Sequence, residues 1–146
     1  MKKQILILIL MLLPVVAMAY DAEIDGIYYN LSRYRAAVTY GNSKYSGDVV
    51  IPSYVIYNGT TYTVISIGDN AFSGCSSLTS ITIPNRVTSI GGSAFHGCSG
   101  LTSINIPNSV TDIGGLAFYG CSGLTSITLP NSVTDIGGLA FYGCSG

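Results

Sequence analysis

LTSINIPNSVTDIGGLAFYGCSG, the stretch 101–123, decides the fold of this chain. The 23 residues before it, 78–100, match it at 18 positions, and the 23 residues after it, 124–146, match it at 21. A partial copy, VISIGDNAFSGCSS, occupies 64–77. A fixed period of this length predicts a solenoid of stacked coils, because one coil is too small to bury its apolar side chains alone.

Apolar residues divide each unit into three short segments. Ile104 and Ile106 alternate with polar neighbours, which predicts a strand with one buried face, and the proline that follows ends it. Val110 and Ile113 flank a second short extended piece. The segment 116–121 lies between glycines and suits one turn of α- or 3₁₀-helix. Stacking should also align equivalent rings into a ladder of Phe72, Phe95, Phe118 and Phe141.

Residues 1–19 have the three-part pattern of a secretory signal peptide. Two lysines give a positive start, 5–16 is an apolar run, and Ala17-Met18-Ala19 is a small-x-small cleavage site. The run is shorter than the roughly 20 residues that a membrane-spanning helix needs. We therefore expect export, cleavage before Tyr20, and no transmembrane segment in the mature chain.

Residues 20–63 do not repeat, and they hold nine of the eleven tyrosines. Short strands are expected there at 26–29, 34–40, 49–51, 54–57 and 61–67. Asn58-Gly59 predicts a tight hairpin, because both residue types accept positive φ. A solenoid needs such a segment to cover the apolar end and free strand edge of its first coil. We interpret 20–63 as a β-rich N-terminal cap; a tyrosine platform for a ligand is the alternative.

The repeated motifs resemble a known family. Leu-x-x-Ile-x-(Ile/Leu)-Pro, at 78–84, 101–107 and 124–130, is similar to the strand signature of leucine-rich repeats. Val-x-x-Ile-Gly and Ala-Phe-x-Gly-Cys-Ser resemble the BspA-like subclass of bacterial surface antigens. The resemblance implies an α/β, right-handed leucine-rich-repeat solenoid. Its 23-residue coils would carry a parallel β-sheet on one face and short helical turns, after a β-rich cap.

For function, the resemblance implies a secreted or cell-surface binding or adhesion protein without catalytic residues. Some members adhere to host extracellular-matrix proteins, so a protein or glycan partner is expected. A structural spacer or scaffold, or a truncated repeat protein without binding activity, is the alternative. Only 9% of residues are charged, which does not favour nucleic-acid binding. From the sequence we expect a protein without enzymatic activity, without a cofactor and without a metal site.

Four cysteines recur at the same place in successive coils: Cys75, Cys98, Cys121 and Cys144. Four cysteines in an exported chain would ordinarily suggest disulfides. Equivalent side chains in a ladder point in parallel, however, whereas a disulfide needs converging Cβ vectors and zinc needs four ligands around one point. The spacing favours buried free thiols, with disulfides and a metal thiolate site as alternatives.

Two surfaces are candidates for partner binding. The outward positions of the first strand carry small uncharged side chains: Ser80, Thr82, Ser103, Asn105, Ser126 and Thr128. A second exposed stripe should contain His96, Tyr119 and Tyr142, which offer larger groups for anchoring a partner. Asp112 and Asp135 lie one coil apart and are expected to be solvated carboxylates, with weak binding of a cation as the alternative.

The sequence stops at Gly146, at the end of a complete unit. An apolar coil end is prone to association. The expectations are a truncated family member, or end-to-end self-association through the uncapped C-terminal coil.

Overall fold

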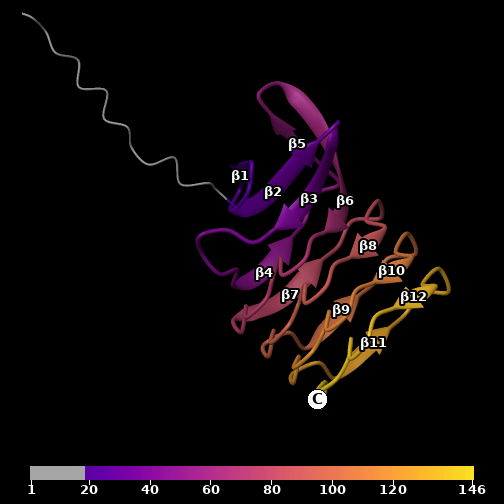
Figure 1. Cartoon of the computed structure of the whole chain (residues 1–146). Coiled ribbons are helices and arrows are strands. Elements are labelled where there is room, and N and C mark those ends of the chain that lie inside the picture. The colour runs from indigo at the N-terminus through magenta and orange to yellow at the C-terminus, as the bar shows by residue number, and fades with distance from the viewer. Residues whose placement is uncertain (1–18) are drawn as a thin grey trace, which may run out of the picture.

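The computed structural model describes residues 19–146. The signal peptide expected at 1–19 therefore lies outside the described residues, except for residue 19. Figure 1 shows the described chain as a stack of coils, with the N-terminal strands at one end and β11 and β12 at the other. Each coil contributes two short strands joined by turns.

The non-repeating segment forms six strands: β1 (Ala22–Ile24), β2 (Ile27–Ser32), β3 (Arg35–Thr39), β4 (Gly47–Val50), β5 (Tyr54–Tyr57) and β6 (Thr60–Ile67). Strands β1, β2 and β3 pair antiparallel in succession, and β5 pairs antiparallel with β6. Asn58 and Gly59 have φ of 49° and 75° and form the two-residue turn between β5 and β6, as the sequence predicts. Strand β6 runs on to Ile67 and so joins this segment to the first repeat.

The repeats extend one large sheet. Its strand order is β1-β2-β3-β6-β8-β10-β12, where β8 is Ser89–Ile90, β10 is Asp112–Ile113 and β12 is Asp135–Ile136. Every pairing from β3 to β12 is parallel. This continuous sheet is built from the second extended piece of each coil, not from the Leu-x-x-Ile-x-Ile strand.

The Leu-x-x-Ile-x-Ile segments form a separate side of the solenoid. They are β7 (Leu78–Thr82), β9 (Ser103–Asn105) and β11 (Ser126–Thr128). Strand β4 pairs parallel with β7, and β9 pairs parallel with β11. A parallel sheet was expected on one face, and the structure confirms parallel pairing but places strands on two sides of each coil.

The third side of each coil consists of turns. The helical turn expected at 116–121 is not confirmed, and residues 19–146 contain no helix. Tyr119 N donates to Leu116 O at 3.0 Å, but positive φ at Leu116 (58°) and Gly120 (69°) stops any helical continuation. The turns instead hydrogen-bond between coils: Phe95 N donates to Ala117 O and Gly97 N to Tyr119 O, both at 2.7 Å.

These inter-coil bonds require close approach of neighbouring backbones. A Cβ atom added to Gly114 would lie 2.5 Å from Gly92 N and 2.6 Å from Gly91 C. Real Cβ atoms do not come so near to backbone atoms, so any side chain at this position would push two coils apart. The Gly-Gly pair of the repeat therefore serves coil packing, not only a sharp turn.

The core contains a continuous column of aromatic rings. The predicted phenylalanine ladder is confirmed: successive rings from Phe72 to Phe141 are stacked with centroids 5.1–5.2 Å apart. The column continues beyond the repeats through Tyr45, 4.6 Å from Phe72, to Tyr28, 5.8 Å further. Tyr45 Oη donates to Thr39 O at 2.7 Å and accepts from Tyr28 N at 3.0 Å, so its polar end is satisfied inside the core.

Substitution of Gly114 tests the role of this close approach. Gly114→Ala should lower the free energy of unfolding by about 1–3 kcal/mol, because the methyl group meets fixed backbone and overpacks the coil interface. The measurement is urea unfolding followed by circular dichroism. Gly138→Ala is the matched control, because no neighbouring atom lies within 4 Å of the position that its Cβ atom would take. Equal losses for both variants would contradict this account of coil packing.

Candidate binding surfaces

The strand ladder consists of Ser80, Thr82, Ser103, Asn105, Ser126 and Thr128. All six side chains are exposed, whereas Ile81 and Ile104 between them are buried. Ser126 lies beside Ser103 and Thr128 beside Asn105 in the parallel register of β9 and β11. The sequence placed these side chains on the outside correctly, because strand alternation fixes the face on which each residue lies.

Strand β4 adds a charge to the head of the strand ladder that the sequence analysis did not select. Asp48 lies beside Ser80 in the β4–β7 register. Its Oδ1 accepts hydrogen bonds from Ser80 Oγ at 2.7 Å and Thr79 Oγ1 at 3.0 Å. These two bonds hold the pKa of the Asp48 carboxyl below its usual range. Next to it, Val50 is 66% exposed beside Thr82, so the ladder begins with an acidic and an apolar group.

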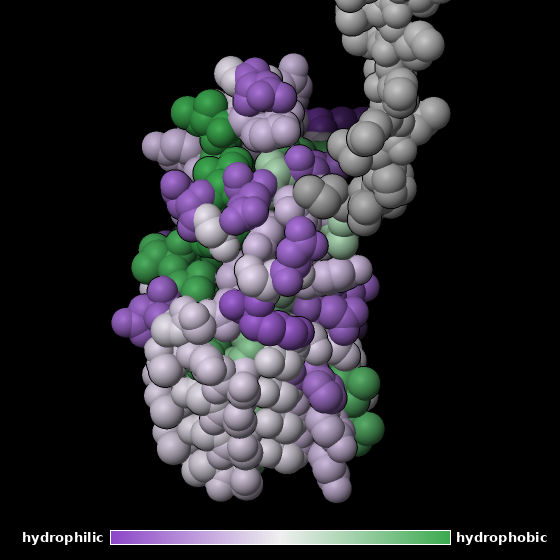
Figure 2. Space-filling view, turned by 90° about the vertical axis from the view of Figure 1, so that its left-hand side faces the viewer, coloured by the Kyte–Doolittle hydropathy of each residue, from purple (hydrophilic) through white to green (hydrophobic). Residues whose placement is uncertain are grey.

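The surface of the repeats carries few strongly hydrophilic or strongly hydrophobic residues. Figure 2 shows the side of the molecule that lies on the left in Figure 1, where pale residues of intermediate hydropathy cover most of the repeats and most of the stronger green and purple colours lie toward the N-terminal strands. Small hydroxyl side chains and glycines account for this appearance. The six ladder residues are Ser, Thr and Asn, so large groups that could anchor a partner are scarce on the strand ladder.

The ring stripe consists of His96, Tyr119 and Tyr142. The rings of His96 and Tyr119 stack with centroids 5.1 Å apart, and those of Tyr119 and Tyr142 with centroids 5.2 Å apart. Tyr142 is 62% exposed, whereas His96 and Tyr119 are half-buried. The expected exposure is thus reduced in the first two rings, because each ring shares its face with the next.

Asp112 and Asp135 are direct neighbours in the parallel register of β10 and β12. Both carboxylates are exposed, and each accepts a hydrogen bond from the preceding threonine, Thr111 at 2.5 Å and Thr134 at 3.2 Å. In the part of the chain that the structure describes, no three His, Cys, Asp or Glu side chains come together to form a metal site. The pair thus remains two solvated carboxylates on the large sheet.

The cysteines are free thiols with a backbone partner. Sγ of Cys98 donates to Phe72 O at 3.1 Å, and Sγ of Cys121 donates to Phe95 O at 3.0 Å. Each thiol therefore bonds to the coil that precedes its own. Burial raises the pKa of the Cys98 and Cys121 thiols to about 12. A protonated, buried thiol is a poor nucleophile and a poor metal ligand.

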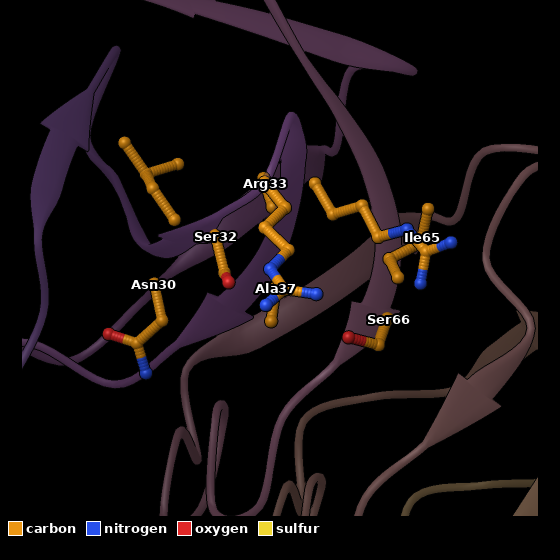
Figure 3. A pocket seen from close by; sticks show the side chains of 9 residues that line it. Asn30, Ser32, Arg33, Ala37, Ile65 and Ser66 are labelled. Atoms are coloured by element: carbon orange, nitrogen blue, oxygen red, sulfur yellow. The ribbon is translucent and has the colours of Figure 1, made fainter.

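Sequence reasoning missed a groove on the N-terminal segment, which we call the cap groove. It encloses about 430 Å³ on the large sheet, where β2, β3 and β6 meet (Figure 3). Its lining residues are Asn30, Leu31, Ser32, Arg33, Arg35, Ala36, Ala37, Ile65 and Ser66. One signal was available in the sequence: of the four basic residues in 20–146, two flank Tyr34. The approach of β6 was not predictable, because it is a long-range contact.

The described residues, 19–146, include no helix long and apolar enough to span a membrane.

The repeats match a known family. The family model for the BspA-type leucine-rich repeat region matches residues 51–146 in six copies. The chain belongs to the BspA-type leucine-rich-repeat family. The resemblance inferred from the repeated motifs is thereby confirmed.

Solved structures agree with this family. A leucine-rich-repeat protein from Bacteroides ovatus is 44% identical, with a TM-score of 0.81 over 86% of this chain and 33% of its own. A leucine-rich cell-surface protein from Faecalibacterium prausnitzii is 33% identical, with a TM-score of 0.72 over 87% of this chain and 34% of its own. A leucine-rich-repeat protein from Bacteroides capillosus is 30% identical, with a TM-score of 0.68 over 77% of this chain and 83% of its own.

The chain thus spans about a third of the length of the first two of these proteins. No curated protein matches the chain significantly. BspA-type leucine-rich-repeat proteins are typically bacterial cell-surface proteins, and leucine-rich-repeat proteins are generally non-catalytic.

Thiol titration tests the burial of the cysteines. In denaturant without reductant, a chromogenic disulfide reagent should detect four thiols, because the structure holds all four cysteines free. In the native protein Cys144 should react first, since its side chain is only half-buried and the other three are buried. Detection of no thiols in the denatured protein would contradict the free-thiol structure.

The same thiols should make stability fall at alkaline pH. Cys98 and Cys121 keep their protons in the folded state up to about pH 12, whereas the unfolded thiols titrate near 9.0. The contribution of these two thiols to the free energy of unfolding is therefore fully present below pH 9 and is lost as the pH rises toward 12. One pH unit above the unfolded pKa, ionisation of each thiol in the unfolded state should lower the free energy of unfolding by about 1.4 kcal/mol.

Urea midpoints at pH values on either side of 9 measure this loss. The double variant Cys98→Ala with Cys121→Ala is the control and should lose less stability over the same pH interval. An identical pH dependence in the variant and the parent would assign the loss to other groups.

Proposed function

We propose that this BspA-type array is an exported, non-catalytic protein that binds a protein or glycan partner at the cell surface through its strand ladder. The observation that carries the proposal is the free hydrogen-bonding capacity of the ladder. Ser80 donates to Asp48, whereas within residues 19–146 the side chains of the other five ladder residues make no hydrogen bond to the protein. A partner therefore meets a row of unused hydroxyl and amide groups.

Rigidity favours the same surface. The ladder side chains lie on strands whose buried residues, Ile81 and Ile104, pack in the core. Groups held in fixed register lose little conformational entropy on binding, which partly offsets the small contact area of Ser and Thr side chains. Extended side-chain rows of this kind are the surfaces that solenoid proteins offer to partners.

Export rests on the sequence of the first 19 residues. The cell-surface description of the F. prausnitzii neighbour supports the same location. The ring stripe is the second part of the proposed surface, since Tyr142 presents an exposed aromatic face next to Tyr119.

A spacer or scaffold is the alternative function, and the bland surface of the repeats favours it (Figure 2). Surfaces rich in Ser, Thr and Gly without large apolar groups suit a protein that separates other domains. The two functions differ in one measurable respect: a spacer has no affinity of its own.

A binding screen with surface variants tests the proposal. The exported chain should bind at least one member of a panel of extracellular-matrix proteins and glycans. Ser103→Arg should weaken that binding at least tenfold, because a long charged side chain blocks the centre of the strand ladder. Biolayer interferometry measures the affinity, and thermal unfolding checks that the variant remains folded.

Ser122→Arg is the matched control, since Ser122 is also exposed but lies in the turn after Cys121. Unchanged binding by Ser103→Arg would remove the ladder from the proposal, and Tyr119→Ala with Tyr142→Ala would then test the ring stripe. Absence of binding to the whole panel would favour the spacer.

A further inference from the structure

Three hairpins of the N-terminal segment share one turn geometry but not one turn chemistry. Each connects its strands by two residues with positive φ: Asp25-Gly26, Arg33-Tyr34 and Asn58-Gly59. Asp-Gly and Asn-Gly are the residue pairs that this turn favours. Arg33 and Tyr34, with φ of 44° and 66°, occupy the same conformation at a steric cost that glycine avoids. Backbone strain that ordinary turn residues would relieve is a reason to look for a function nearby.

The strained turn borders the cap groove. Three lining residues lie side by side across the sheet, because Ala37 of β3 pairs with Asn30 of β2 on one side and with Ser66 of β6 on the other. Figure 3 shows Arg33 with its guanidinium group over Ala37, with Asn30 and Ser32 to one side and Ser66 to the other. The turn therefore contributes a cation to the lining of a groove of about 430 Å³, within the range of small-ligand pockets (~300–1,000 Å³).

The charge of the cap groove is positive. Arg33 and Arg35 both line it, and no acidic residue does. The carboxylate of Asp21 lies near its border, where Oδ2 accepts a hydrogen bond from Leu31 N at 2.7 Å. Asp112 is further away in the same sheet, three strands from Ala37, or roughly 14 Å at ~4.8 Å per strand. That distance exceeds the Debye length of about 8 Å in physiological salt, so Asp112 does not cancel the field of the arginines.

We propose that the cap groove binds the carboxylate or sulfate group of an acidic polysaccharide. Two guanidinium groups suit a planar carboxylate or a sulfate, because each offers paired N–H donors in a fixed fork. Asn30, Ser32 and Ser66 supply amide and hydroxyl groups that pair with sugar hydroxyls around the anion. Only two large apolar side chains, Leu31 and Ile65, line the groove. The side chains of an acidic peptide would therefore find few apolar contacts there. The groove lies on the large sheet, so this proposal does not rest on the strand ladder.

A turn replacement separates loss of binding from loss of folding. Arg33→Asn with Tyr34→Gly installs the residue pair that the turn geometry favours and removes one guanidinium group. The variant should unfold at a higher temperature than the parent and bind acidic polysaccharide at least tenfold more weakly. Arg35→Ala should also weaken binding. Arg86→Ala is the matched control, because Arg86 is an exposed arginine in the repeats, outside the groove.

The probes are polygalacturonate for carboxylate, dextran sulfate for sulfate, neutral dextran, and polyglutamate, each measured by biolayer interferometry with the exported chain. Binding of either acidic polysaccharide, weaker at high salt and in both groove variants, is the expected result, and the preferred probe identifies the anion. Equal binding of neutral dextran, full binding by the turn variant, or no binding of either acidic polysaccharide would overturn the proposal. Polyglutamate binding as tight as that of the acidic polysaccharides would also overturn it. The strand-ladder variant Ser103→Arg should leave this binding unchanged, so failure of one proposal can be told from failure of the other.

Discussion

The close approach of neighbouring backbones on the turn side is the constraint on which the structure depends. Phe95 N reaches Ala117 O in the next coil at 2.7 Å only because Gly114 places no side chain against the backbone of Gly91 and Gly92. These backbone contacts on the turn side also hold the strands of neighbouring coils in register. Neighbouring coils are hydrogen-bonded on the turn side and through the large sheet, and on the third side β4 pairs with β7 and β9 with β11. The short strands of the repeats, some only two residues long, persist because this stacking supports them.

The aromatic column shows how the repeats are connected to the N-terminal segment. A stack of parallel phenylalanine rings ends at Phe72, and Tyr45 covers its last face with a tilted ring. The hydroxyl group of Tyr45 is satisfied by backbone atoms of Thr39 and Tyr28. Tyrosine thus extends an apolar stack into a region where polar atoms must be paired. Part of the tyrosine content of this segment therefore serves the core and is not free to bind a ligand.

Sequence periodicity was sufficient to predict the repeat, its buried faces and the phenylalanine ladder, since all of these follow from the local pattern and its translation by one unit. It was not sufficient for the turn at 116–121, where good helix formers suggested a helical turn. Leu116 takes positive φ there because its N–H group bonds to Gly138 O of the next coil, and no local propensity reveals such a contact. The alternation of the first strand placed the six ladder residues outside. Asp48 and the cap groove depend on pairings between distant segments, β4 with β7 and β3 with β6, and a single sequence gives no register for them.

Equivalence of the coil interfaces has a consequence for how this chain changes over generations. Phe95 and Phe118 meet their neighbours at the same 5.1 Å spacing, and the glycine contacts recur from coil to coil. Duplication or deletion of one whole unit in the gene therefore recreates an interface that already exists. The array can gain or lose length without a new packing solution, while the features of the N-terminal segment are inherited intact.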